Sequence, residues 1–199
     1  MKNGVKKVFS DKILRGLLFY QIVSLLPLNL IFLFVVFLIY YVLKLSPLLL
    51  GLTYVLPMFG SFIGNFIAYK TKIKNKFLLA LLLILPDFSP IAYYFVKNVE
   101  ELFLAYLVFI VSSIIGSYTS YYTSLAIFKI IPEEVFATTD SVISSISSVF
   151  DYAFTVLSSI IISFISYHIA VIIGVILMTV IDLYFVPTFW IKIIEMKEK

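Results

Sequence analysis

The chain has 199 residues, of which 62% are hydrophobic and only 13% are charged. A soluble domain is about 45–50% apolar and about 25% charged, so a soluble fold of this size could not hide so much apolar surface. The composition predicts a single integral membrane domain over residues 1–199. The basic residues, which give a net charge of +4, flank the apolar stretches, and this indicates membrane orientation and no nucleic-acid partner.

Six apolar stretches are long enough to cross a bilayer as helices, which takes roughly 20 residues each. The expected spans are Gly16–Val42, Pro47–Tyr69, Phe77–Val96, Leu102–Phe128, Ser141–Ser166 and Ile169–Ile191. Continuous apolar runs of this length argue against barrel strands, which alternate in polarity over about ten residues. The sequence thus predicts an all-α integral membrane protein, multi-pass in the cell membrane, with the lipid bilayer as its main partner.

Lysine and arginine are divided unequally between the two sides of these spans. The side that carries both termini holds Lys2, Lys6, Lys7, Lys12, Arg15, Lys70, Lys72, Lys74, Lys76, Lys129, Lys192, Lys197 and Lys199. Only Lys44 and Lys97 fall on the other side. Because cytoplasmic segments are enriched in lysine and arginine, both termini are expected to be cytoplasmic.

Enzyme chemistry has little support in the sequence. Cysteine is absent and His168 is the only histidine, so neither a thiolate nucleophile nor a two-histidine zinc site can form. The chain also lacks a G-x-S-x-G elbow and a phosphate-binding loop of the P-loop type. We therefore expect no enzymatic activity, no cofactor and no metal.

Three carboxyl groups are expected near mid-depth of the membrane: Asp87, Asp151 and Asp182. Ionisable groups inside a bilayer are costly and commonly mark substrate paths or proton relays. Without a cationic partner, an apolar environment favours the neutral, protonated carboxyl group. Asp87 also lies between Pro86 and Pro90, where a loosened backbone could form a small cation or proton site. We expect the three groups to serve a substrate path or proton coupling, with structural hydrogen bonding as the alternative.

Small polar residues recur every three or four positions in the fourth and fifth spans, which places them on one face of each helix. The fourth span carries Ser113, Gly116, Ser117, Ser120 and Ser124, and the fifth carries Ser141, Ser144, Ser148, Asp151, Thr155 and Ser158. Such stripes let membrane helices approach closely, which predicts a tight interface between spans four and five. A second interpretation makes the stripe with Ser148 and Thr155 a polar wall of a substrate path.

Two polar residues of the first span, Gln21 and Asn29, lie about on one face and are expected to form hydrogen bonds between helices. Trp190, the single tryptophan, is expected to anchor the last span at the inner membrane surface.

The second span and its flanks carry a recognisable pattern. Leu45-Ser46-Pro47 opens the span, glycines follow at Gly51, Gly60 and Gly64, and the basic loop Lys70–Lys76 comes after it; Ile131-Pro132-Glu133-Glu134 precedes the Ser-rich fifth span. This pattern resembles one six-helix half of a major facilitator superfamily transporter, with a degenerate signature loop in which Ala68 stands at the acidic position. The resemblance implies two three-helix units of inverted topology and the pairing of two copies as a homodimer.

Two functions of different classes follow. The first is a half-size secondary transporter that moves a small-molecule solute as a dimer, with protons as a candidate coupling ion; Asp151→Asn would then abolish proton-coupled uptake. The second is a non-transporting scaffold or accessory subunit, whose stripes would bind other membrane subunits. The substrate-binding subunits of ATP-driven vitamin importers also have six helices, but they resemble one another in an alanine-rich first helix, and this chain has no alanine between Met1 and Leu50.

Overall fold

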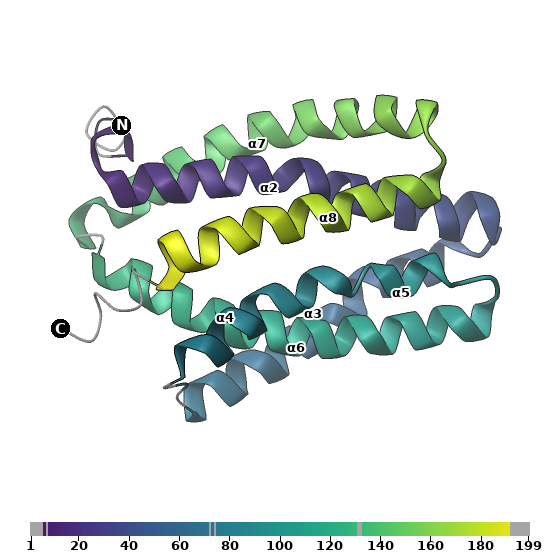
Figure 1. The fold of residues 1–199 in the computed structure, drawn as a ribbon, viewed down its shortest axis with the longest axis horizontal. Helices are drawn as coiled ribbons and strands as arrows, with labels where there is room; N and C mark the ends of the chain where they lie inside the picture. The colour runs from purple at the N-terminus through teal and green to yellow at the C-terminus, as the bar shows by residue number, and fades with distance from the viewer. Residues whose placement is uncertain (1–5, 7, 72, 74, 131–132, 192–199) are drawn as a thin grey trace.

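The computed structural model describes residue 6 and residues 8–71, 73, 75–130 and 133–191. In this part of the chain every regular element is helical and there is no strand (Figure 1). The helices are α2 (Lys12–Phe37), α3 (Pro47–Lys70), α4 (Lys76–Ile84), α5 (Ile91–Tyr94), α6 (Val99–Ile130), α7 (Glu133–Phe164) and α8 (Tyr167–Phe185). Short helical segments extend three of them: η1 (Leu38–Val42) follows α2, η2 (Leu85–Phe88) follows α4 and η3 (Val186–Trp190) follows α8.

Six stretches of the described residues are long and apolar enough to cross a membrane. They are Lys12–Val42, Pro47–Lys70, Phe77–Tyr94, Val99–Leu125, Phe136–Phe164 and Tyr167–Trp190. The six predicted spans are thereby confirmed, with boundaries that shift by a few residues. One shift has a local cause: α2 begins at Lys12, one turn earlier than predicted, because Asp11 Oδ1 accepts hydrogen bonds from the backbone N–H of Ile13 (2.9 Å) and Leu14 (3.3 Å).

The third span is interrupted where its two prolines fall. Pro86 lies in the 3₁₀ turn η2, and Pro90 precedes the short helix α5. The carbonyl of Pro86 is satisfied by the backbone N–H (3.1 Å) and hydroxyl (2.8 Å) of Ser89 and by the hydroxyl of Ser112 on α6 (3.4 Å). A broken helix is tolerated at membrane depth when neighbouring groups satisfy its backbone in this way.

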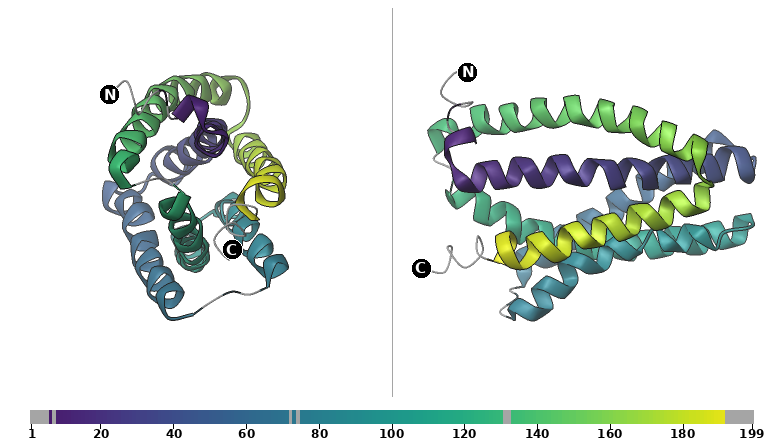
Figure 2. Two further views of the ribbon diagram at one scale, coloured as in Figure 1. Left: turned by 90° about the vertical axis from the view of Figure 1, so that its left-hand side faces the viewer. Right: turned by 45° about the horizontal axis from the view of Figure 1, so that its top comes forward.

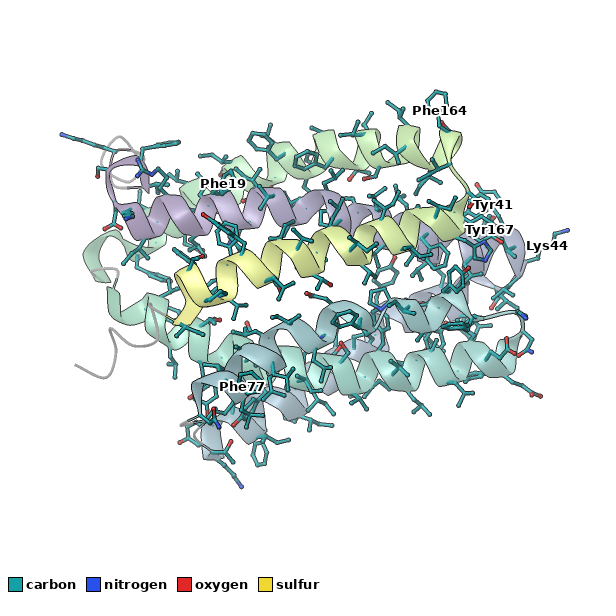
Figure 3. All side chains as sticks on the ribbon, viewed as in Figure 1. Phe19, Tyr41, Lys44, Phe77, Phe164 and Tyr167 are labelled. Atoms are coloured by element: carbon teal, nitrogen blue, oxygen red, sulfur yellow. The ribbon has the colours of Figure 1, made fainter. Side chains whose placement is uncertain are left out.

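The two ends of the bundle differ in charge. At one end α2, α4 and α7 begin and α3, α6 and η3 end; we call it the Lys12 end (Figure 1). Lys44 marks the opposite end (Figure 3), the Lys44 end, where α6 also starts just after Lys97. The fold thus keeps Lys44 and Lys97 together and apart from the basic residues of the Lys12 end. The side of the membrane on which each end lies stays a prediction.

The spans pack in two groups of three: α2 with α7 and α8, and α6 with α3 and the third span. α2 lies between α7 and α8, and α6 lies between α3 and the third span (Figure 2). Glycine allows the closest approaches: a Cβ atom added to Gly60 of α3 would lie 2.5 Å from the carbonyl oxygen of Ile110 on α6. Likewise, a Cβ atom on Gly174 of α8 would lie 3.1 Å from the carbonyl oxygen of Pro27 on α2. Close contact of this kind holds membrane helices together in place of a hydrophobic driving force.

The predicted interface between spans four and five is wrong. Within the described residues, α6 and α7 have almost no contact beyond the stacked rings of Phe128 and Phe136, 4.5 Å apart, where the chain turns from one helix into the other. Each helix packs elsewhere: α6 on the glycine face of α3, α7 on α2. Periodicity predicts that residues share one face of a helix, but it does not say which helix that face meets.

Large apolar side chains cover the outside of the bundle. Phe77 and Phe164 lie at opposite ends of the bundle (Figure 3), and 77% and 84% of their surfaces are exposed. In a soluble protein such side chains would be a liability, whereas facing lipid tails they cost little.

Candidate functional site

Two buried carboxyl groups meet inside the bundle. Asp87 comes from η2 and Asp182 from α8, and only 9% and 4% of their surfaces are exposed. Their carboxyl groups lie within hydrogen-bonding reach of each other. We call them the Asp87–Asp182 pair. The sequence placed both residues near mid-depth, and the fold brings them together.

The two carboxyl groups of the Asp87–Asp182 pair differ in the hydrogen bonds that they accept from other side chains. The hydroxyl of Tyr20 on α2 donates to Asp182 Oδ1 at 2.9 Å. Asp87 Oδ2 is buried and receives no hydrogen bond from the described protein groups. Because a carboxylate has no hydrogen to donate, the two carboxyl groups can hydrogen-bond to each other only when one of them carries a proton. The arrangement therefore favours a single proton shared between them.

The Asp87–Asp182 pair opens into a cavity of about 370 Å³ between α2, the third span, α6 and α8. Its polar lining consists of Tyr20, Gln21, Asp87, Thr119, Ser120, Thr123, Ser124 and Asp182, with Trp190 among the apolar lining residues. None of the described lining residues is a lysine, arginine or histidine. The lining therefore offers oxygen atoms and two acids, but no fixed positive charge.

A second cavity, of about 340 Å³, continues from the first toward the Lys12 end. The two share four lining residues, among them Gln21 and Ser124. The continuation reaches Thr139 and Asp140 near the start of α7, where the Asp140 side chain is exposed. We call the two cavities together the inner chamber. It leads from the Lys12 end to the Asp87–Asp182 pair.

Asp151 lies elsewhere, in a hydrogen-bonded group of three residues. Asn29 Nδ2 of α2 donates to Asp151 Oδ1 of α7 at 2.8 Å. The hydroxyl of Thr155 lies 2.7 Å from Asn29 Oδ1 and 2.8 Å from the carbonyl oxygen of Asp151, so one hydrogen serves both acceptors. All three residues line a separate cavity of about 480 Å³ between α2, α3, α6 and α7, which we call the outer chamber.

The remaining predicted residues are spread over several environments. Gly116 and Ser120 line the inner chamber, Ser113 packs beside Gly60 of α3, and Ser117 is half-buried on α6. Ser144 and Ser148 lie on the exposed face of α7, and the Ser148 hydroxyl donates to the carbonyl of Ser144 (2.8 Å). Ser148 therefore lines neither chamber.

The structure confirms the expectation for Gln21 and Asn29 of the first span and contradicts the one for Trp190. Hydrogen bonding between helices is confirmed for Asn29 and also for Gln21, whose Oε1 accepts from the Ser147 hydroxyl of α7 at 3.2 Å. Trp190 is not a surface anchor: it is 7% exposed, and its ring stands perpendicular to that of Tyr20 at 5.3 Å. Sequence reasoning missed Tyr20, since nothing distinguishes it among 14 tyrosines except its place beside Gln21.

The fold and composition define the chain as a helical protein with six stretches able to span a membrane. No protein-family model, curated protein or solved structure matches it.

Proposed function

We propose that the chain is a half-size secondary transporter of a small solute that works as a homodimer. The Asp87–Asp182 pair is its coupling site, and protons are the coupling ion. Asp151 and Thr155 form a wall of the solute path, whereas the sequence alone made Asp151 the residue whose substitution should abolish proton-coupled uptake.

The observation that carries this proposal is the pair of chambers at different depths along α2. The inner chamber uses residues of α2 near Leu17 and Gln21, whereas the outer chamber begins at Leu25, and the two share no lining residue. Alternating access requires a site that is reached from one side at a time. Two chambers that each hold a carboxyl group and share no lining residue fit that requirement better than they fit a purely structural bundle.

The packing pattern supports an origin in two inverted three-helix repeats. If spans one, two and three correspond to spans four, five and six, the contact of α3 with α6 corresponds to that of α7 with α2. The contact of α2 with α8 then corresponds to that of α6 with the third span. Under this correspondence Asp87 and Asp182 come from equivalent spans, which favours a site on the axis between the repeats.

The exposed face of α7 favours a dimer. It carries Ser144 and Ser148, which hydrogen-bond only within their own helix, and only a small part of the span is buried in the bundle. Polar groups on a membrane helix favour contact with another helix over lipid. A second copy would cover this face and supply the opposite wall of the path.

Proteoliposomes with a pH-sensitive dye inside test the transport proposal. Solutes of different charge are added outside one at a time, and internal pH is followed. We expect at least one class to drive proton movement in the wild type, none in Asp87→Asn or Asp182→Asn, and wild-type flux in the exposed-site control Glu100→Gln. Flux equal to that of empty liposomes across the panel would refute transport. Coupling lost in Asp151→Asn but kept in Asp87→Asn would instead assign the coupling site to Asp151.

The exposed face of α7 also favours a second candidate, a scaffold or accessory subunit that binds helices of other chains. Purification in mild detergent separates the two. A complex that contains only this chain supports the transporter, and stable co-purification with unrelated membrane subunits supports the scaffold.

A further inference from the structure

We propose that the inner chamber binds a small organic monocation, such as an alkylammonium ion, in exchange for the proton shared by Asp87 and Asp182. This inference rests on the proposed transport function and adds the class of solute. Four features of the chamber carry it: its charge, its unsatisfied oxygens, its size and its aromatic wall.

Charge excludes an anion. The ionisable groups that face the Asp87–Asp182 pair are the two acids themselves and Tyr20 from α2; the described residues of α4, α6 and η3 contribute none to the cavity around it. An anion placed there would meet one or two negative charges with no cation to offset them. A cation in the same place would be attracted by these negative charges.

Two residues that line the inner chamber carry a buried side-chain oxygen without a hydrogen-bond partner among the described protein groups. Asp87 Oδ2 is buried and receives no hydrogen bond from the described protein groups. Thr139 is fully buried, lines the part nearer the Lys12 end, and its hydroxyl also has no partner there. Buried polar groups are nearly always hydrogen-bonded. Once the shared proton has left, Asp87 again lacks a donor, and a bound ammonium group can supply one.

Size and surroundings favour an organic cation over a metal ion. The described residues contain no group of three or more Asp, Glu, His or Cys side chains able to hold a metal. A cavity of about 370 Å³ falls in the range of small-molecule sites. Its wall includes the aromatic residues Tyr20 and Trp190, and aromatic faces attract ammonium groups, while Leu17, Leu83 and Met178 can accept alkyl groups.

The exchange balances in charge. With one shared proton the Asp87–Asp182 pair carries a charge of −1 before the cation binds. When the cation binds, the O–H bond of the protonated carboxyl group breaks and the proton leaves through the chamber to water. The pair then carries −2 and the cation +1, so the site has the same charge of −1 that it had before binding. A neutral solute of the same shape has no such means of releasing the proton.

Equilibrium binding to the purified dimer tests the inference without any transport step. The probes are methylammonium, choline and tetraethylammonium, with 3,3-dimethylbutan-1-ol as the neutral isostere of choline. Two readouts are used: fluorescence of Trp190, the only tryptophan of the chain, and proton release by calorimetry in buffers of different ionisation enthalpy. We expect at least one cation to bind with release of about one proton, and its affinity to rise about tenfold per pH unit while the proton is shared. The isostere should bind at least tenfold more weakly than choline.

The variants are Asp87→Asn and Asp182→Asn, which replace a carboxyl by an amide of the same shape, and Glu100→Gln makes the same exchange at an exposed site. We expect at least a tenfold loss of affinity in the first two and none in the third. The wild-type pH dependence remains a test even where an Asn variant does not fold.

The inference is overturned if no cation binds, if choline and its isostere bind alike, or if affinity is independent of pH. Cation binding without proton flux in liposomes would support the cation site and refute the transport function. Proton flux driven by a neutral or anionic solute would support the transport function and refute the cation site.

Discussion

Asn29 Nδ2 of the first span donates to Asp151 Oδ1 of the fifth at 2.8 Å, and this bond joins two helices separated by 122 positions in sequence. The same amide nitrogen lies 2.9 Å from the carbonyl oxygen of Leu25 within its own helix. One side chain thereby ties the interface of α2 with α7 to the backbone of α2. The Thr155 hydroxyl completes the group at 2.7 Å from Asn29 Oδ1.

A double-mutant cycle measures the strength of this contact. Asn29→Ala and Asp151→Ala should each lower the free energy of unfolding, and the double variant should lower it by less than the sum. The expected coupling is about 0.5–2 kcal/mol, the range for hydrogen bonds between membrane helices. Unfolding in mixed detergent micelles gives the four values. Strict additivity would mean that the bond contributes nothing to stability.

The approach of α3 to α6 depends on glycine. A Cβ atom at Gly64 would meet the backbone of Ile114 on α6 at less than contact distance. Gly64→Ala should therefore force the helices apart and cost about 1–3 kcal/mol. Gly51 lies on the same helix with no atom within 4 Å of its Cβ position, so Gly51→Ala should be neutral or stabilise by about 0.5–1 kcal/mol. Thermal unfolding of the two variants gives the comparison, and equal melting temperatures would contradict this account of the packing.

Tyr20 is expected to stabilise the bundle through Asp182. Tyr20→Phe keeps the ring, which packs on Trp190 and Phe185, and removes only the hydroxyl that donates at 2.9 Å. The expected loss is about 0.5–1.5 kcal/mol of unfolding free energy. Tyr41→Phe is the matched control because that side chain is exposed at the Lys44 end (Figure 3). A Tyr20 variant as stable as the control would mean that the bond to Asp182 carries no net energy.

Orientation can be measured directly because the chain has no cysteine. Single substitutions Lys97→Cys and Lys70→Cys place one thiol at each end of the bundle, both at exposed positions. A membrane-impermeant maleimide should label Lys97→Cys in intact cells and Lys70→Cys only after permeabilisation, because the basic Lys12 end is expected to face the cytoplasm. The opposite pattern would invert the orientation.

The sequence was sufficient for the spans, because they follow from the length of each apolar stretch. It also identified Asn29 as a side chain that bonds to another helix. The sequence could not predict which helices pack against each other. The predicted stripe of α6 is divided between two neighbours: Ser113 packs beside Gly60 of α3, whereas Gly116 lies near Pro86 of the third span and lines the inner chamber. Periodicity alone does not distinguish these environments.

The candidate site was only partly predictable for the same reason. Asp87 and Asp182 were recognised as separate acids at similar depth, and depth alone does not say that two spans 95 positions apart face each other. Tyr20 is one of 14 tyrosines, and Trp190, the only tryptophan, was expected at the membrane surface and not beside the acids. What makes them part of the site is the direction in which their rings point, which follows from the packing of α2 against α8.

The interlocked packing has a consequence for synthesis. α2 leaves the ribosome first, yet its principal neighbours are the last two spans, and α3 must wait for α6. A nascent chain that ends after α5 therefore has three inserted spans but few of their final contacts. The synthesis of α6 first gives α3 and the third span a packing partner, whereas α2 gains its partners only with α7 and α8.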